Sequence, residues 1–152
     1  MRQLLFNPIG MDIHLRTIIT YGVYHFRKKV QLDAVPDSLR LIVSADNRYN
    51  LFFNGERVAY SPAEGNLKTY KYDVVDIAPF LVKGNKILAI LVHNAGAEKP
   101  LSFLSAKTAF LCQPYDDRYR TVFGAQDWKA PSGNFFKIRT SLLFSMNLEV
   151  FK

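Results

Sequence analysis

The chain has 152 residues, the usual size of one domain with one hydrophobic core. Hydrophobic residues make up 49% of it and charged residues 22%, a balance that excludes intrinsic disorder. The formal net charge is +7, but Arg27–Lys29 is the only run of three cations. The scattered basic residues therefore predict a solvated surface and no nucleic-acid site.

The single cysteine, Cys112, excludes an intramolecular disulfide and a cysteine-based zinc cluster. Its neighbours Phe110 and Leu111 predict a buried thiol. Residues 1–16 lack the compact apolar run of a signal peptide, and no stretch approaches the roughly 18 apolar residues of a membrane helix. We therefore expect no membrane partner.

The first clear strands follow an N-terminal extension, residues 1–20. From Tyr24 to Leu32, apolar and polar residues alternate, which is typical of a half-buried strand. Residues 39–45 repeat the period of two, with Leu39, Leu41, Val43 and Ala45 on the inward face.

A hairpin comes next, because residues 49–53 run into Asn54-Gly55 and residues 56–60 can return alongside them. Both turn residues tolerate positive φ, which a type I′ turn requires. Residues 67–75 predict a further β-rich segment. Asp76 is placed to cap a single helical turn, and Gly84 with Asn85 can end that connection.

Residues 86–92 are apolar on both faces and predict a central strand covered from both sides. Residues 103–111 predict another strand, and the alternation over 141–150 predicts a closing one. Many short strands with little helix indicate an all-β, two-sheet sandwich or a barrel, in one module over residues 21–152.

No standard catalytic or metal-binding spacing is present. The three histidines, His14, His25 and His93, are dispersed, and His93 at a strand end is more often structural than catalytic. Acidic residues suitable for glycoside hydrolysis exist, but nothing in the sequence pairs any two of them: Asp46, Glu64, Asp73 and Asp76. We predict no catalytic residue, metal ligand or cofactor. Loops rich in Asp and Asn could hold a structural calcium ion, but no dedicated loop is present.

Three ordered motifs carry a family resemblance. They are Tyr21-Gly-Val-Tyr-His-Phe-Arg-Lys-Lys-Val, then Val43-Ser-Ala-Asp-Asn-Arg-Tyr-Asn-Leu-Phe-Phe-Asn-Gly, and then Val75-Asp-Ile-Ala-Pro-Phe-Leu with Gly84-Asn-Lys-Ile-Leu-Ala-Ile-Leu-Val. Together they resemble the N-terminal, galactose-binding-like jelly-roll domain of bacterial α-L-rhamnosidases, over about residues 21–113. Where the family would show Gly-Pro-x-Arg-Gly-Asp, this chain has Ser61-Pro-Ala-Glu-Gly-Asn, so no role of that arginine transfers to Glu64.

The resemblance implies a non-catalytic accessory module of a rhamnosidase-like glycoside hydrolase. Its expected partners are the catalytic domain of a parent enzyme and rhamnose-containing glycans. A periplasmic or secreted location would follow if that parent degrades polysaccharide. The competing hypotheses are a stand-alone protein-interaction domain with the same fold and an independent hydrolase.

Sugar-contacting residues are expected in the turns, where Asp, Asn and Arg offer hydrogen bonds and tyrosine offers a stacking face. The loops beside Tyr49 and Tyr60 are the places to look for such a face. The predicted carbohydrate-contacting residues are Asp46, Asn47, Arg48, Tyr49, Glu64, His93 and Asn94.

Overall fold

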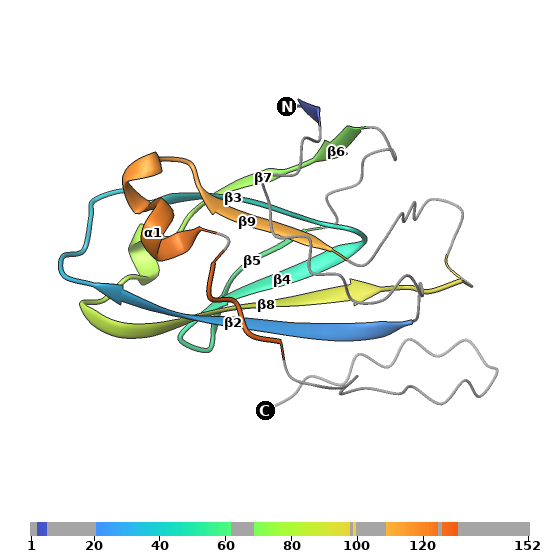
Figure 1. Cartoon of the computed structure of the whole chain (residues 1–152), viewed down its shortest axis with the longest axis horizontal. Coiled ribbons are helices and arrows are strands. Elements are labelled where there is room, and N and C mark those ends of the chain that lie inside the picture. The colour runs from blue at the N-terminus through green and yellow to red at the C-terminus, as the bar shows by residue number, and fades with distance from the viewer. Residues whose placement is uncertain are drawn as a thin grey trace.

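The computed structural model describes residues 3–5, 21–61, 69–97, 99, 109–124 and 126–130. In this part of the chain, two antiparallel sheets pack face to face (Figure 1). The first sheet has the order β2 (Gly22–Leu32), β8 (Gly84–Asn94), β4 (Arg48–Phe53), β5 (Glu56–Ser61). The second has the order β7 (Asp73–Asp76), β3 (Arg40–Ala45), β9 (Phe110–Pro114).

The chain crosses repeatedly between the two sheets, as in a jelly roll. It passes from β2 to β3, back to β4 and β5, across to β7, back to β8 and again to β9. The predicted all-β sandwich is therefore confirmed. A separate two-stranded ladder joins β1 (Gln3–Leu5) to β6 (Thr69–Lys71), so three residues of the predicted N-terminal extension pair with the module. The boundary at residue 20 stays a prediction.

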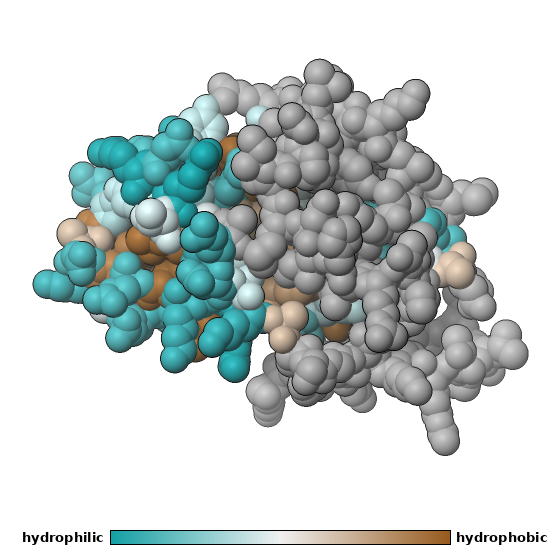
Figure 2. All heavy atoms as spheres, viewed as in Figure 1, coloured by the Kyte–Doolittle hydropathy of each residue, from teal (hydrophilic) through white to brown (hydrophobic). Residues whose placement is uncertain are grey.

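The core lies between the sheets because each strand turns alternate side chains inward. Leu41 and Val43 of β3 and Leu51, Leu88 and Ile90 of the facing sheet are all fully buried. Phe110 packs between Phe26 and Trp128, with ring centroids 4.7 and 5.0 Å away. On the face seen in Figure 2, hydrophilic side chains surround smaller apolar patches in the coloured part of the surface.

The hairpin and the capped turn are confirmed. Asn54 and Gly55 have φ values of 51° and 86°, as a type I′ turn requires. The expected helical turn is η1 (Ala78–Phe80), where the Asp76 carboxylate accepts from the backbone N–H groups of Ala78 and Leu39 at 3.0 and 3.1 Å. These hydrogen bonds, the one from Ala78 first, lower the pKa of Asp76.

Two short helical segments were not predicted: η2 (Asp117–Tyr119) and α1 (Arg120–Phe123). They cover one end of the sandwich, where Phe123 is fully buried. None of the helices in the part of the chain given above is long and apolar enough to cross a membrane.

The prediction for residues 86–92 is half right. β8 is central, between β2 and β4, but its outer face is not fully covered, since Ile87 is 44% exposed. The further strand predicted over 103–111 is described from Phe110 onward as β9, which ends at Pro114, three residues beyond the predicted end. Residues 101–108 and the predicted closing strand at 141–150 lie outside the described residues.

The prediction of solvated surface for Arg27–Lys29 is wrong for its middle residue. Lys28 faces the core with 3% exposure, and its ammonium donates to the carbonyl oxygen of Gly124 at 3.0 Å. Strand alternation forces this, because Phe26 and Val30 on either side also point inward. Burial lowers the pKa of Lys28, although the negative charge of Asp127 partly opposes the shift.

Candidate functional site

The structure brings most of the predicted sugar-contacting residues to one end of the sandwich. Asp46 and Asn47 form the turn between β3 and β4, and Asn94 ends β8 beside them. The Asn94 side-chain amide donates to Asp46 at 3.0 Å, and its oxygen accepts from Gly96 N–H at 2.8 Å. Asn47 accepts from Ala95 N–H at 2.8 Å. We call these five residues the Asn94 cluster.

The Asn94 cluster is buried and its hydrogen bonds are directed at the protein itself. Asn94 has no exposed surface, and Asp46 and Asn47 are 7% and 5% exposed. Their polar atoms hold the two loops together, which is the ordinary role of Asp and Asn in turns. These three side chains therefore do not offer the open polar surface that sugar contact was predicted to use.

Arg48 and His93 lie opposite each other on neighbouring strands, on the outer face of the four-stranded sheet. Arg48 is exposed, whereas His93 is half-buried and meets the Tyr21 ring edge to face at a centroid distance of 5.5 Å. Burial, with the positive charge of Arg48, lowers the pKa of His93. The histidine is thus held neutral in a packed position. Glu64 lies outside the described residues.

Tyr49 does not present a stacking face, contrary to the prediction. It points into the core with 2% exposure, and its hydroxyl donates to the Asp73 carboxylate at 2.7 Å. Burial first, then this hydrogen bond, raises the pKa of Tyr49, so the phenol keeps its proton. Its inward position follows from strand alternation, because Leu51 and Phe53 of β4 share the same face.

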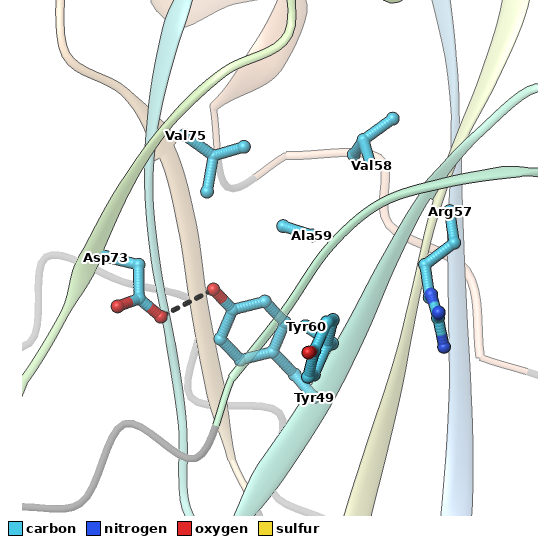
Figure 3. A pocket seen from close by; sticks show the side chains of 7 residues that line it. All are labelled: Tyr49, Arg57, Val58, Ala59, Tyr60, Asp73 and Val75. Carbon is cyan, nitrogen blue, oxygen red and sulfur yellow. Dashed lines mark hydrogen bonds between the residues drawn. The ribbon is translucent and has the colours of Figure 1, made fainter.

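A cleft lies beside this hydrogen bond, at the open edge of the sandwich. It has a volume of about 400 Å³ and is bounded by residues of β4, β5 and β7 (Figure 3). Both β5 and β7 are edge strands, so no further strand of the described part closes the sandwich on this side. We call it the edge cleft, and its lining residues are Tyr49, Arg57, Val58, Ala59, Tyr60, Asp73 and Val75.

The edge cleft contains one exposed aromatic ring with a cation beside it. Tyr60 is 69% exposed, and the Arg57 guanidinium carbon lies 5.1 Å from the centre of its ring. This is cation–π distance, and it orients both side chains at the mouth of the cleft. Among the described lining residues, Asp73 is the one carboxylate.

The described lining of the edge cleft differs from a glycosidase site in its number of carboxyl groups. Glycosidases use two carboxyl groups about 5–9.5 Å apart, and the described lining offers only one. The described residues also contain no group of three or more His, Cys, Asp or Glu side chains that could hold a metal ion.

The sequence indicated Tyr60 as a place to look for a stacking face and Asp73 as a candidate acidic residue. It gave no sign that the two residues line the same cleft. Tyr60 and Asp73 lie on different strands, and they line one cleft because β5 and β7 form the edges of facing sheets. Arg57 was missed because residues three apart on a regular strand point to opposite faces, and only the irregular pairing of β5 with β4 brings Arg57 and Tyr60 to the same side.

Solved structures of rhamnosidases contain segments that are similar to this chain. The chain is similar to part of a GH78 family rhamnosidase of a Bacillus species, with 25% identity and a TM-score of 0.60. The match covers 73% of this chain and 12% of that one. An α-L-rhamnosidase of Streptomyces avermitilis, solved with L-rhamnose, matches at 21% identity and a TM-score of 0.47, over 73% of this chain and 10% of that one.

An α-L-rhamnosidase of Aspergillus terreus also matches, at 17% identity and a TM-score of 0.48, over 86% of this chain and 16% of that one. No protein-family model matches the chain, and no curated protein does. The likeness to the Bacillus enzyme confirms the resemblance read from the three motifs: the chain corresponds to a segment of a rhamnosidase.

Proposed function

We propose that this chain is a non-catalytic accessory module of an α-L-rhamnosidase-like glycoside hydrolase, with a structural role and a glycan contact. The observation that carries the proposal is the match to the Bacillus rhamnosidase, which spans most of this chain and only 12% of that enzyme. A segment of that size corresponds to one module of a larger protein, and its partner is then the catalytic domain of that protein.

The non-catalytic part of the proposal is supported by the edge cleft. Its described lining holds a single carboxylate, which already accepts the Tyr49 hydroxyl. A general acid and a nucleophile or base cannot both be drawn from it. Fold likeness alone does not transfer or exclude an activity, so the support for a non-catalytic role comes from the single carboxylate in the described lining.

The test is an assay of the purified chain with 4-nitrophenyl α-L-rhamnopyranoside. We expect no release of nitrophenol above the level given by heat-denatured chain. Turnover that Asp73→Asn abolishes would contradict the non-catalytic assignment. The accessory assignment is tested at the encoding gene, where we expect the reading frame past the codon for Lys152 to encode a barrel-sized region with catalytic carboxylates.

One observation favours the alternative of a protein-interaction domain. The strand register places two cross-strand rows side by side on the outer face of the four-stranded sheet: Arg27, Ala89, Phe52, Arg57 and His25, Leu91, Asn50, Tyr60. The described residues on this outer face of the four-stranded sheet include no Asp or Glu. They include four Lys or Arg residues: Arg27, Lys29, Arg48 and Arg57. Interfaces are enriched in aromatic residues and arginine in this way.

This alternative predicts self-association or capture of an acidic protein surface. Small-angle scattering of the chain over a concentration series distinguishes the two functions. A monomer at all concentrations agrees with the accessory module, whereas a dimer that Arg27→Glu disrupts supports the interaction domain.

A further inference from the structure

Asn54 and Gly55 form the tip of the β4–β5 hairpin, and they are the one Asn-Gly pair in the sequence. This dipeptide is chemically labile, because glycine has no side chain to hinder its backbone nitrogen. After losing its proton, the Gly55 nitrogen attacks the side-chain carbonyl carbon of Asn54. A five-membered succinimide forms as the side-chain amide leaves as ammonia. Water then opens the ring at either carbonyl, giving aspartate or isoaspartate, so one water is consumed for each ammonia released and no other reactant is needed.

The fold leaves the reacting groups open to water. Both Asn54 and Gly55 are exposed, and a Cβ built on Gly55 would meet no atom within 4 Å. Asn85 is also exposed but is followed by lysine, whereas Asn47 and Asn94 are buried. Among the described asparagines, Asn54 therefore combines exposure with an unhindered neighbour.

The Asn54 side chain also completes the pairing of the hairpin with β8. Its backbone N–H donates to the Ile87 carbonyl oxygen at 2.9 Å, and its side-chain Oδ1 accepts from the Ile87 N–H at 3.0 Å. With φ at 51°, Asn54 has left the extended conformation, so Oδ1 takes the place of the main-chain oxygen that a strand residue would offer. The chemical state of this side chain therefore affects whether β4 and β8 stay paired as far as the turn.

The two hydrolysis products act differently on this turn. Aspartate keeps an oxygen on the side chain that can accept from the Ile87 N–H. Isoaspartate routes the main chain through the former side chain, which inserts one methylene group between residues 54 and 55. A two-residue type I′ turn closes only with particular dihedral angles at both central residues, so the inserted group is incompatible with it.

The turn positions a strand that shapes the edge cleft. Arg57 and Tyr60 of β5 line the cleft, and β5 is an edge strand whose neighbour within the sheet is β4. Its pairing with β4 is already irregular between Leu51 and Phe52. A longer turn therefore changes how β5 lies against β4 and moves the two cleft residues with it.

We propose that Asn54-Gly55 is a site of spontaneous deamidation, and that its isoaspartate product disrupts the β4–β5 hairpin and alters the edge cleft. This inference goes beyond the accessory role and does not depend on it, because it concerns the chemistry of the turn whatever the cleft contacts. Each modified chain gains one carboxylate, which lowers the formal net charge by one unit from +7. Ion-exchange chromatography therefore separates modified from unmodified chains.

Incubation of the purified chain at pH 8 and 37 °C tests the site. The incubation continues until well after a synthetic peptide with the sequence of residues 50–59 has converted completely. Peptide mapping by mass spectrometry follows each asparagine, and methylation by protein L-isoaspartate O-methyltransferase identifies isoaspartate. We expect conversion at Asn54 before any at Asn85. An intact Asn54 at the end of the incubation, or conversion at Asn85 as fast as at Asn54, would overturn the assignment.

Gly55→Asn is the matched control for the chemistry. Asparagine tolerates the positive φ of residue 55, whereas its side chain hinders the attacking nitrogen. Conversion at Asn54 should then fall to the level seen at Asn85. Undiminished conversion in this variant would refute attack by the backbone nitrogen of residue 55.

Asn54→Asp separates the effect of the new charge from that of the longer main chain. We expect this variant to keep the melting temperature and the β5 amide shifts of the wild type. The isoaspartate form, isolated by ion exchange, should melt roughly 4–8 °C lower and show displaced amide signals for Arg57 and Tyr60. Unchanged signals for these two residues in the isoaspartate form would contradict the effect on the edge cleft.

Discussion

At the scale of single residues, buried ionisable groups determine how the protein responds to pH and to thiol reagents. Cys112 is 4% exposed in the core, and burial raises the pKa of its thiol to about 12. His25 and His93 are half-buried, and burial lowers the pKa of both. In each case the folded protein favours the neutral form, because removal from water penalises the charge.

We expect Cys112 to be unreactive toward a thiol reagent in the native protein. The thiolate is the reactive species, and at pH 8 a buried group with a pKa of about 12 supplies almost none of it. Absorbance after addition of 5,5′-dithiobis(2-nitrobenzoate) should remain flat in buffer and rise to one thiol per chain in 6 M urea. Rapid labelling in buffer would show that Cys112 is accessible.

Acidification should lower the melting temperature between pH 7.5 and 5.0. His25 and His93 have lower pKa values in the folded chain than the unfolded value of about 6.5, so below that value the unfolded state binds more protons. Stability is therefore lost as pH falls from the unfolded pKa toward the folded ones. The lowered pKa of Asp76 acts in the same direction only below its usual value, outside this window.

The measurement is differential scanning fluorimetry of the wild type and of the double variant His25→Gln/His93→Gln. The double variant should lose most of the drop in melting temperature. A drop of the same size in both proteins would assign the pH response to other groups.

At the scale of elements, turns with special backbone geometry fix the register of the strands. The β4–β5 hairpin turns through Gly55 at φ 86°, where a built Cβ would meet no atom within 4 Å. Residue 55 has space for a side chain, but its positive φ is a backbone conformation that residues with a side chain rarely adopt. The hairpin also carries Arg57 and Tyr60, so its register determines the shape of the edge cleft.

Gly55→Val should destabilise the protein by about 1–2 kcal/mol, because a β-branched residue is forced into the left-handed region. Gly55→Asn is the matched control, since asparagine tolerates the left-handed region far better than a β-branched residue does. The difference is read from urea unfolding midpoints. A Gly55→Val midpoint equal to that of the control would mean that the turn relaxes to another type without cost.

At the scale of the whole molecule, the Asn94 cluster joins the two sheets. Asp46 follows β3 of one sheet and Asn94 ends β8 of the other, and their side chains are hydrogen-bonded at 3.0 Å with almost no exposure. Lys28 makes a second long-range contact, from β2 to the carbonyl oxygen of Gly124 after α1. These polar contacts close the ends of the sandwich that the apolar core leaves open.

Asn94→Ala should cost about 2–4 kcal/mol of unfolding free energy, because it removes one partner from the buried Asp46 carboxylate and one from Gly96 N–H. Asn50→Ala on the outer face of β4 is the control and should cost well under half as much. Both are measured by urea unfolding. Comparable losses in the two variants would show that the Asn94 cluster does not stabilise the pairing of the sheets.

The sequence by itself determined the fold class and much of its register. Period-two alternation located β2 and β3, Asn54-Gly55 marked the β4–β5 hairpin and Asp76 marked the capped turn, because these signals act between residues close in the chain. The three motifs determined the resemblance that the Bacillus rhamnosidase comparison confirmed.

Only the tertiary structure decided which polar residues are available to a ligand. Asp46, Asn47 and Asn94 have the chemistry of a sugar site, but folding turns them toward each other, and it buries Tyr49 as the floor of the edge cleft. Tyr60 and Asp73 become neighbours because facing sheets end in β5 and β7. Strand order is set by contacts between residues far apart in the chain, so a local pattern could not reveal that cleft.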